Sequence, residues 1–258
     1  MVLSHLDLFS GIGCFSLAAQ KQKIDTKQFV EIDPFCQQIL TKNFPNIPIH
    51  SDIKTYTTTE NFDIITGGFP CQDLSVANVN GIGLFNKDRS GLWFEYLRLI
   101  KEIQPKGIVI ENVPPTLNRN WLYEVLKGLF ENGYNAIWQT FQACDFGYLH
   151  RRSRLYIIAY SNQNGQSSIK TINRYFDKNL QRKFTRVCGT SINSSSICNV
   201  FKSIPERFVF RVSNGITGKL DKLPIEERKR IGAIGNSLIP EIAEFNLYIL
   251  KSIIADML

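Results

Sequence analysis

The sequence predicts an α/β fold in which a mostly parallel sheet carries helices on both faces. Three observations lead to this prediction. Six short β-forming runs occur within the first 160 residues, and longer helical patterns lie between most of them. Several runs are continuously apolar, as in strands that are covered on both sides. Strands that alternate with helices in this way form parallel sheets built from βαβ units.

The elements follow in order along the chain. Strands are expected at 5–9, 29–32, 62–66, 107–112, 136–141 and 154–160, where β-branched and aromatic residues are frequent. Helices are expected at 15–23, 34–43, 92–103 and 121–132. Pro34 suits a helix start and Gly133 a helix end. A final amphipathic helix is expected over 239–253, because apolar residues recur there at three- and four-residue steps.

Composition divides the chain into a main domain over 1–160, a small irregular region over 161–215, and a C-terminal segment over 216–258 whose helix packs back on the main domain. The middle region is rich in Ser and Asn and shows little periodicity. The net charge is +7, and residues 170–230 alone hold fourteen basic and five acidic side chains. This charge favours nucleic acid over a membrane as partner, with a solvated basic surface as the alternative.

Two further features narrow the class of protein. The N-terminus shows no secretory signal, and no apolar run approaches the roughly 20 residues that span a bilayer, so a cytoplasmic protein is expected. The six cysteines include no CxxC pair. Free thiols are therefore expected, with no disulfide framework and no bound metal.

The segment LDLFSGIGCFS indicates a cofactor site at the end of the first strand. Gly11 and Gly13 let the backbone approach a ligand closely, and Glu31, at the end of the second strand, is placed to accept hydrogen bonds from ribose hydroxyls. Asp52 is expected at the end of a third strand. An adenosine cofactor is therefore favoured over a merely structural tight turn. Because the third glycine of the dinucleotide fingerprint is replaced by Ser16, S-adenosylmethionine is favoured over NAD.

The stretch GGFPCQDLS places Cys71 where an apolar strand leads into a loop. A free cysteine is commonly a small buried hydrophobe, but this one is expected at the same sheet edge as the cofactor. Glu111 and Asn112 end another strand at that edge. A thiolate is a strong nucleophile, so Cys71 can add to an electron-poor ring while a protonated carboxyl assists at a ring nitrogen.

Five motifs resemble those of the DNA (cytosine-5-)-methyltransferases in order and approximate spacing. They are DLFSGIG, PCQ at 70–72, ENV at 111–113, HRRSRLYIIA and GNSLIPEIA. The resemblance covers residues 3–160 and about 211–250. It implies a Rossmann-like methyltransferase fold that uses S-adenosyl-L-methionine and releases S-adenosyl-L-homocysteine. Residues 1–160 would then be the catalytic domain and 161–215 the target-recognition region, which contacts DNA phosphates and bases.

The resemblance also implies roles for individual residues. Cys71 would attack C6 of a cytosine flipped out of the duplex, and Glu111 would hold and protonate N3. Arg154 is expected to contact the base and Arg152 nearby carboxylates or phosphate, with a purely structural role as the alternative. The expected cofactor contacts come from the strand ends and two later motifs: Phe9, Gly11, Gly13, Glu31, Asp52, Ile53, Pro70, Leu92 and Asn236.

The sequence departs from the family pattern at Cys14, Leu149 and His150, where glycine, proline and glutamine are common. None of these changes removes a reacting atom. The leading hypothesis is a monomeric enzyme that methylates a short double-stranded DNA sequence, as in restriction-modification systems whose endonuclease acts separately. A tRNA methyltransferase and a non-catalytic nucleic-acid binder remain alternatives, although the Cys-Phe-Thr signature of the tRNA branch is absent from 161–215.

Overall fold

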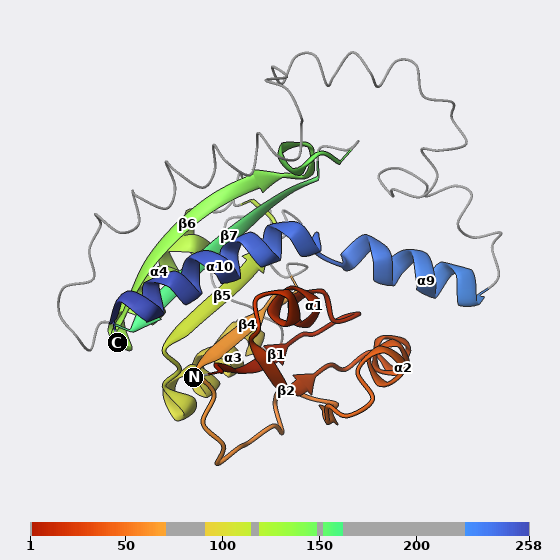
Figure 1. Cartoon of the computed structure of the whole chain (residues 1–258), viewed down its shortest axis with the longest axis horizontal. Helices are drawn as coiled ribbons and strands as arrows, with labels where there is room; N and C mark the ends of the chain where they lie inside the picture. The colour runs from red at the N-terminus through yellow and green to blue at the C-terminus, as the bar shows by residue number, and fades with distance from the viewer. Residues whose placement is uncertain (1, 71–90, 115–118, 149–151, 162–224, 258) are drawn as a thin grey trace, which may run out of the picture.

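One seven-stranded sheet forms the centre of the protein, in the order β3-β2-β1-β4-β5-β7-β6 (Figure 1). The structure is a computed structural model that describes residues 2–70, 91–114, 119–148, 152–161 and 225–257. The strands are β1 (Ser4–Leu8), β2 (Asp25–Val30), β3 (Ile49–His50), β4 (Ile64–Gly67), β5 (Gly107–Asn112), β6 (Tyr134–Gln142) and β7 (Ser153–Ser161).

Strands β1 to β5 pair in parallel, whereas β7 runs antiparallel to both of its neighbours, β5 and β6. The prediction of a mostly parallel sheet is confirmed. The reversal of β7 has a consequence for the site. The first residues of β7 lie at the edge of the sheet where β1, β4 and β5 end. Side chains from the beginning of β7 therefore lie near side chains from the ends of the parallel strands.

Helices cover both faces of the sheet, as predicted. Helices α3 (Gly91–Ile103) and α4 (Arg119–Glu131) pack on one face, and α1 (Cys14–Lys21) and α10 (Pro240–Met257) pack on the other. The remaining helices of the described residues are α2 (Pro34–Asn43), the 3₁₀ helix η1 (Ala143–Phe146) and α9 (Ile225–Asn236). Among the described residues, no helix combines the length and apolar character needed to cross a bilayer.

Helix α10 is attached to the sheet by close packing and by polar contacts with α1. A Cβ atom added at Gly107 in β5 would overlap the side chain of Leu250, so the helix lies directly against the strand. The Lys251 ammonium donates to the Gln22 carbonyl at 2.6 Å, and the Gln22 amide donates to Glu244 at 3.0 Å. The C-terminal helix therefore belongs to the same core as the N-terminal strands.

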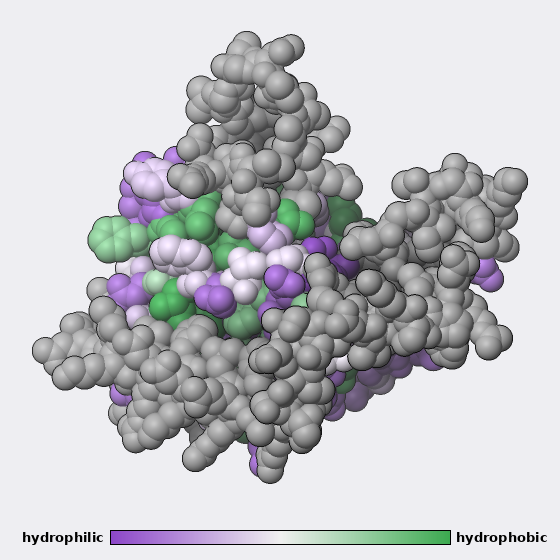
Figure 2. All heavy atoms as spheres, turned by 90° about the horizontal axis from the view of Figure 1, so that it is seen from above, coloured by the Kyte–Doolittle hydropathy of each residue, from purple (hydrophilic) through white to green (hydrophobic). Residues whose placement is uncertain are grey.

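The side of the molecule that Figure 2 views from above shows apolar residues interspersed with hydrophilic ones on its described surface. The edge strand β6 carries Trp138 with 50% of its surface exposed, and α4 carries the exposed Tyr123 and Phe130. Exposed apolar side chains among polar ones are normal on protein surfaces. They therefore identify no binding partner by themselves.

A chain of buried polar side chains crosses three neighbouring strands beneath the glycine turn. The imidazole of His5 contacts the Thr26 hydroxyl through Nδ1 at 2.8 Å and the Thr66 hydroxyl through Nε2 at 2.7 Å. The hydroxyls of Thr66 and Ser16 donate to the Asp7 carboxylate at 3.2 and 2.6 Å. Burial raises the pKa of Asp7 to about 7, and the charge of Glu31 also raises it, although the hydroxyl donors oppose this change.

Replacing Asp7 with asparagine is expected to change how stability depends on pH. With a folded pKa near 7 and an ordinary value near 3.8, folded Asp7 holds a proton that the unfolded chain has lost. The wild type should therefore lose stability relative to Asp7→Asn as pH rises from about 4 to about 7, by at most about 1.4 kcal/mol per pH unit. Urea unfolding of both proteins across this range measures the difference.

His5 gives the opposite slope, because burial lowers its pKa to about 3, but it is present in both proteins and cancels in the comparison. A difference that stays constant with pH would contradict a protonated Asp7.

Candidate active site

The predicted cofactor residues of the first two strands lie together at the carboxyl edge of the sheet. Phe9 and Gly11 follow β1 with positive φ angles of 52° and 54°, which turn the chain sharply into α1. The Gly11 amide donates to Glu31 Oε2 at 2.6 Å, and the Asp33 amide donates to Oε1 of the same carboxylate at 2.8 Å. The structure therefore brings the glycine turn and the predicted ribose acid into direct contact.

The space around the two glycines differs. A Cβ atom at Gly11 would meet nothing within 4 Å, so open space lies beside the backbone at this point. At Gly13, which has φ 86°, a Cβ atom would approach Phe44 and Leu40 of the α2 region at 2.7 and 2.9 Å. Gly13 thus permits close packing of α2 on the turn, and Gly11 leaves room for a ligand.

Glu31 is buried, with 8% of its surface exposed. Burial raises the pKa of its carboxyl, and the hydrogen bonds from the backbone amides of Asp33 and Gly11 oppose that rise. The two carboxylate oxygens together offer about four acceptor positions, more than the backbone amides of Gly11, Ile32 and Asp33 occupy. A hydroxyl group in the open space beside Gly11 could therefore still donate to Glu31.

Asp52 and Ile53 lie in a tight turn that follows the short strand β3. The Lys54 amide donates to Asp52 Oδ1 at 2.9 Å, which fixes the direction of the Asp52 side chain. Ile53 is buried in the core that lies on the α3 and α4 face, and Phe9 packs against the same core. The turn therefore belongs to the same region of the structure as Phe9.

Aromatic side chains connect the glycine turn to the end of β4 and to α3. The ring of Phe9 stacks on Tyr96 with a centroid distance of 6.4 Å, and Phe69 lies 5.8 Å from Trp93 and 5.7 Å from Trp121. Leu92, another predicted cofactor contact, is partly buried against this core. Packing of Phe69 in this aromatic cluster thus fixes the position of the backbone just before Pro70.

Residues Gly67 to Pro70 leave β4 beside the end of β5. The Asn112 amide donates to the Phe69 carbonyl at 3.2 Å, and its oxygen accepts from the Val113 amide at 2.8 Å. A Cβ atom at Gly68 would lie 2.7 Å from Glu111 Oε2, so any larger residue here would require the carboxylate to move. Pro70 is exposed, whereas Cys71, Leu149 and His150 lie outside the described residues.

Glu111 and Arg154 form an ion pair at the same edge. Arg154 Nε lies 2.9 Å from Glu111 Oε1, and 23% and 13% of the two side chains are exposed. In the antiparallel pairing of β5 and β7, Glu111 lies directly opposite Tyr156, so their side chains share one face of the sheet. Arg154 precedes Tyr156 by two residues and therefore projects from that same face. Burial raises the pKa of Glu111, and the charges of Arg154 and Arg152 oppose that rise.

Arg152 lies just before β7 and contributes to the same charge cluster. Burial lowers the pKa of its guanidinium, the neighbouring charge of Arg154 lowers it further, and Glu111 opposes both effects. Asn236, the last predicted cofactor residue, is the final residue of α9. The structure therefore brings Glu111, Arg152 and Arg154 together at one edge of the sheet.

One residue of this region was not predicted. Arg98 of α3 donates hydrogen bonds to the Ile53 and Tyr56 carbonyls in the turn that follows β3. The residues that it contacts are 45 and 42 positions away in the sequence, and the atoms contacted belong to the backbone. No local sequence pattern therefore predicts the contact.

The sequence profile of the C-5 cytosine-specific DNA methylases matches residues 3–246. The chain belongs to this family. The type II methyltransferase M2.BsuMI of Bacillus subtilis is 37% identical over 164 residues, which are 60% of this chain and 41% of the relative. The type II methyltransferase M1.ScrFI of Lactococcus lactis is 35% identical over 178 residues, 67% of this chain and 43% of the relative. The chain thus spans less than half the length of these two relatives.

Solved structures share the fold of this family member. A DNA modification methyltransferase encoded within an Escherichia coli prophage is 26% identical, with a TM-score of 0.54 over 64% of this chain and 49% of that one. The Dnmt2 methyltransferase of Schizosaccharomyces pombe is 17% identical, with a TM-score of 0.64 over 96% of this chain and 98% of that one. The Rossmann-like methyltransferase fold expected from the sequence is confirmed.

Proposed function

We propose that the protein transfers a methyl group from S-adenosyl-L-methionine to C5 of a cytosine in double-stranded DNA. The family match over residues 3–246 supports this reaction class. The observation that carries the proposal is the Glu111–Arg154 pair, which lies beside Gly68, three residues before Cys71. A carboxyl, a guanidinium and the backbone that leads to a thiol are the groups needed to hold a cytosine and activate its ring.

The residues at the edge of β1 and β2 fit the proposed cofactor. Open space beside Gly11 and the carboxylate of Glu31 suit a ribose, and Phe9 offers an aromatic ring. Asp52 and Ile53 would flank the adenine. Pro70, Leu92 and Asn236 complete the proposed contacts, and Gly13 keeps the turn tight. Bound there, S-adenosyl-L-methionine would supply an electrophilic methyl group and leave as S-adenosyl-L-homocysteine.

The chemistry assigns distinct tasks to the side chains. The Cys71 thiolate forms a bond to C6 of the cytosine while Glu111 gives a proton to N3, which makes C5 nucleophilic enough to accept the methyl group. A base then removes the proton from C5, and Cys71 leaves by β-elimination. The raised pKa of Glu111 favours the protonated carboxyl that this step requires. Arg154 would donate to the base and orient Glu111.

Substrate recognition is proposed to involve the basic region over 161–215. This region holds nine basic and two acidic side chains, and the basic ones would bind DNA phosphates in a salt-dependent manner. The target cytosine would be flipped out of the duplex to reach Cys71. The protein would act as a monomer in the cytoplasm, and the methyl groups that it adds would protect DNA from a separate restriction endonuclease.

Methyl transfer to defined substrates tests the proposed function. In one experiment, the purified protein is incubated with radiolabelled S-adenosyl-L-methionine and either duplex DNA or tRNA. In a second experiment, bisulfite sequencing of DNA from cells that express the protein locates the modified cytosines. Label in DNA at one recurring sequence context is the expected result. Label confined to tRNA would replace the substrate class, and label in neither nucleic acid would refute the proposed reaction.

A further inference from the structure

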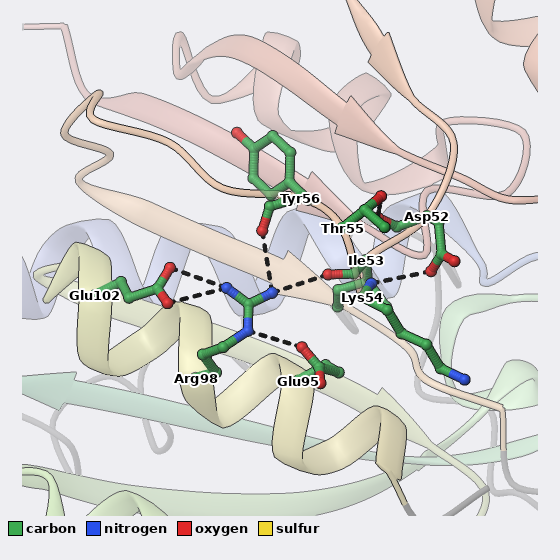
Figure 3. Close-up of polar contacts among 8 residues, drawn as sticks. All are labelled: Asp52, Ile53, Lys54, Thr55, Tyr56, Glu95, Arg98 and Glu102. Carbon is green, nitrogen blue, oxygen red and sulfur yellow. Dashed lines mark hydrogen bonds and ion pairs between the residues drawn. The ribbon is translucent and has the colours of Figure 1, made fainter. Parts of the chain in front are cut away.

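The side chain of Arg98 connects α3 to the turn after β3 through hydrogen bonds in two directions (Figure 3). Nη2 donates to the carbonyl oxygens of Ile53 at 2.9 Å and Tyr56 at 3.0 Å. Nε donates to Glu95 at 2.7 Å, and Nη1 donates to both carboxylate oxygens of Glu102 at 3.0 Å. One guanidinium thus spans the space between a helix and a turn.

The turn that Arg98 contacts has a defined shape of its own. The amides of Thr55 and Tyr56 both donate to the Asp52 carbonyl at 3.1 Å, and the Lys54 amide donates to the Asp52 carboxylate. These bonds shape the turn internally but do not attach it to the rest of the molecule. Arg98 supplies polar contacts to α3, the side chains of Ile53 and Tyr56 are buried in the core, and His50 of β3 contacts Thr55 and Tyr56.

The geometry requires an arginine in particular. A planar guanidinium directs its N–H groups in fixed, divergent directions, so it can bind two carbonyls and two carboxylates at once. Glu95 and Glu102 lie three and four residues from Arg98 on the helix and hold the guanidinium in one orientation. Only 29% of the Arg98 side chain is exposed, so water screens these bonds less than it would at an open surface.

We propose that Arg98 is a positioning residue for the adenine end of the cofactor site. It contacts no proposed cofactor atom, and it acts by holding the Asp52–Ile53 backbone at a fixed distance from α3. This inference rests on the proposed function, because that function assigns Asp52 and Ile53 to the adenine.

Direct binding of S-adenosyl-L-homocysteine tests the proposal without requiring catalysis. Isothermal titration calorimetry compares the wild type with Arg98→Ala, Arg98→Lys and Lys101→Ala, an exposed cation on the same helix as the matched control. Arg98→Ala should weaken binding about 10-fold, and Arg98→Lys should restore only part of the affinity. Lys101→Ala should bind like the wild type. In turnover assays, Arg98→Ala should raise KM for the methyl donor more than it lowers kcat.

Hydrogen exchange supplies a readout that a general loss of stability would not reproduce. In Arg98→Ala, the amides of Thr55 and Tyr56 should exchange at least about 10-fold faster than in the wild type, while the amides of β5 keep their protection. Uniformly faster exchange across the sheet, with unchanged affinity for S-adenosyl-L-homocysteine, would show a merely structural role and overturn the proposal.

Two outcomes separate this inference from the proposed function. If the wild type itself fails to bind S-adenosyl-L-homocysteine, the proposed function is wrong. If the wild type binds and Arg98→Ala binds equally well, only the positioning role is wrong. Should Arg98→Ala not fold, the double variant Glu95→Gln, Glu102→Gln keeps the arginine but loosens its orientation. Weaker binding by that variant would support the proposal, and wild-type affinity would overturn it.

Discussion

Replacing Cys71 with serine is expected to lower the rate of DNA methylation by at least about 10³-fold. A serine hydroxyl remains protonated at neutral pH and is a far weaker nucleophile than a thiolate, so the bond to C6 of cytosine would not form at a useful rate. Initial rates with radiolabelled S-adenosyl-L-methionine and duplex DNA measure the effect. Binding of S-adenosyl-L-homocysteine should remain close to that of the wild type, since the sulfur is not needed for it.

The three cysteines in the part of the chain that the structure describes provide the contrast. Burial, followed by neighbouring acidic charge, raises the pKa of both Cys14 and Cys36 to about 12, so these thiols stay protonated at neutral pH. Cys144→Ser serves as the matched control and should keep wild-type activity. DNA that contains 5-fluorocytosine should trap a covalent complex with the wild type and with Cys144→Ser. A trapped complex with Cys71→Ser would show that another residue is the nucleophile.

Replacing Glu111 with glutamine is expected to lower the rate by about 10²–10⁴-fold, the usual contribution of a general acid. Glutamine can still donate a hydrogen bond to N3 but cannot deliver a proton. The pH profile of kcat/KM identifies the cause. The wild-type rate should fall as pH rises through the pKa of Glu111, which burial raises and Arg154 and Arg152 lower. The same pH region should be flat for Glu111→Gln, and an equal fall in both proteins would contradict the assignment.

The position of the Glu111 carboxylate can be tested separately from its proton. In Gly68→Ala, the new methyl group would lie 2.7 Å from Glu111 Oε2 and 3.3 Å from the Glu111 carbonyl, so the acid has to move. A displacement of this size is expected to cost about 10–100-fold in rate. Gly232→Ala is the matched control, because a methyl group there meets nothing within 4 Å. Full activity of Gly68→Ala would contradict a requirement for close placement of the carboxylate.

The sequence predicted strands and helices correctly where a continuous apolar run or a helix-capping residue marks them. The apolar run at 107–112 matches β5, and the helix predicted at 34–43 matches α2, where Asp33 caps the first turn by accepting from the Phe35 amide at 2.8 Å. The helix α9 was not predicted, because its residues 225–236 are largely charged and polar and show no strong apolar face. Its glycines also weaken a helical signal.

The family motifs identified in advance several polar residues that the structure places at one edge of the sheet. Glu111, Arg152 and Arg154 lie together because β7 runs antiparallel to β5, so that the beginning of β7 lies beside the end of β5. Contacts made by backbone atoms were not predictable. Arg98 donates to two backbone carbonyls, and Glu31 accepts from two backbone amides. Because backbone atoms have the same chemistry at every position, the sequence does not show which of them a side chain will contact. Such contacts emerge only when the chain is folded.

Because β7 runs antiparallel to β5, the Glu111–Arg154 ion pair depends on the register in which these two strands pair. Side chains alternate between the faces of a sheet, so deleting a single residue between Arg154 and Tyr156 would turn the guanidinium toward α3 and α4 and away from Glu111. The ion pair and the hydrogen-bond ladder are therefore constrained together. We therefore expect any change of length between Ser153 and Ser161 to disrupt the pairing of β7 with both of its neighbours.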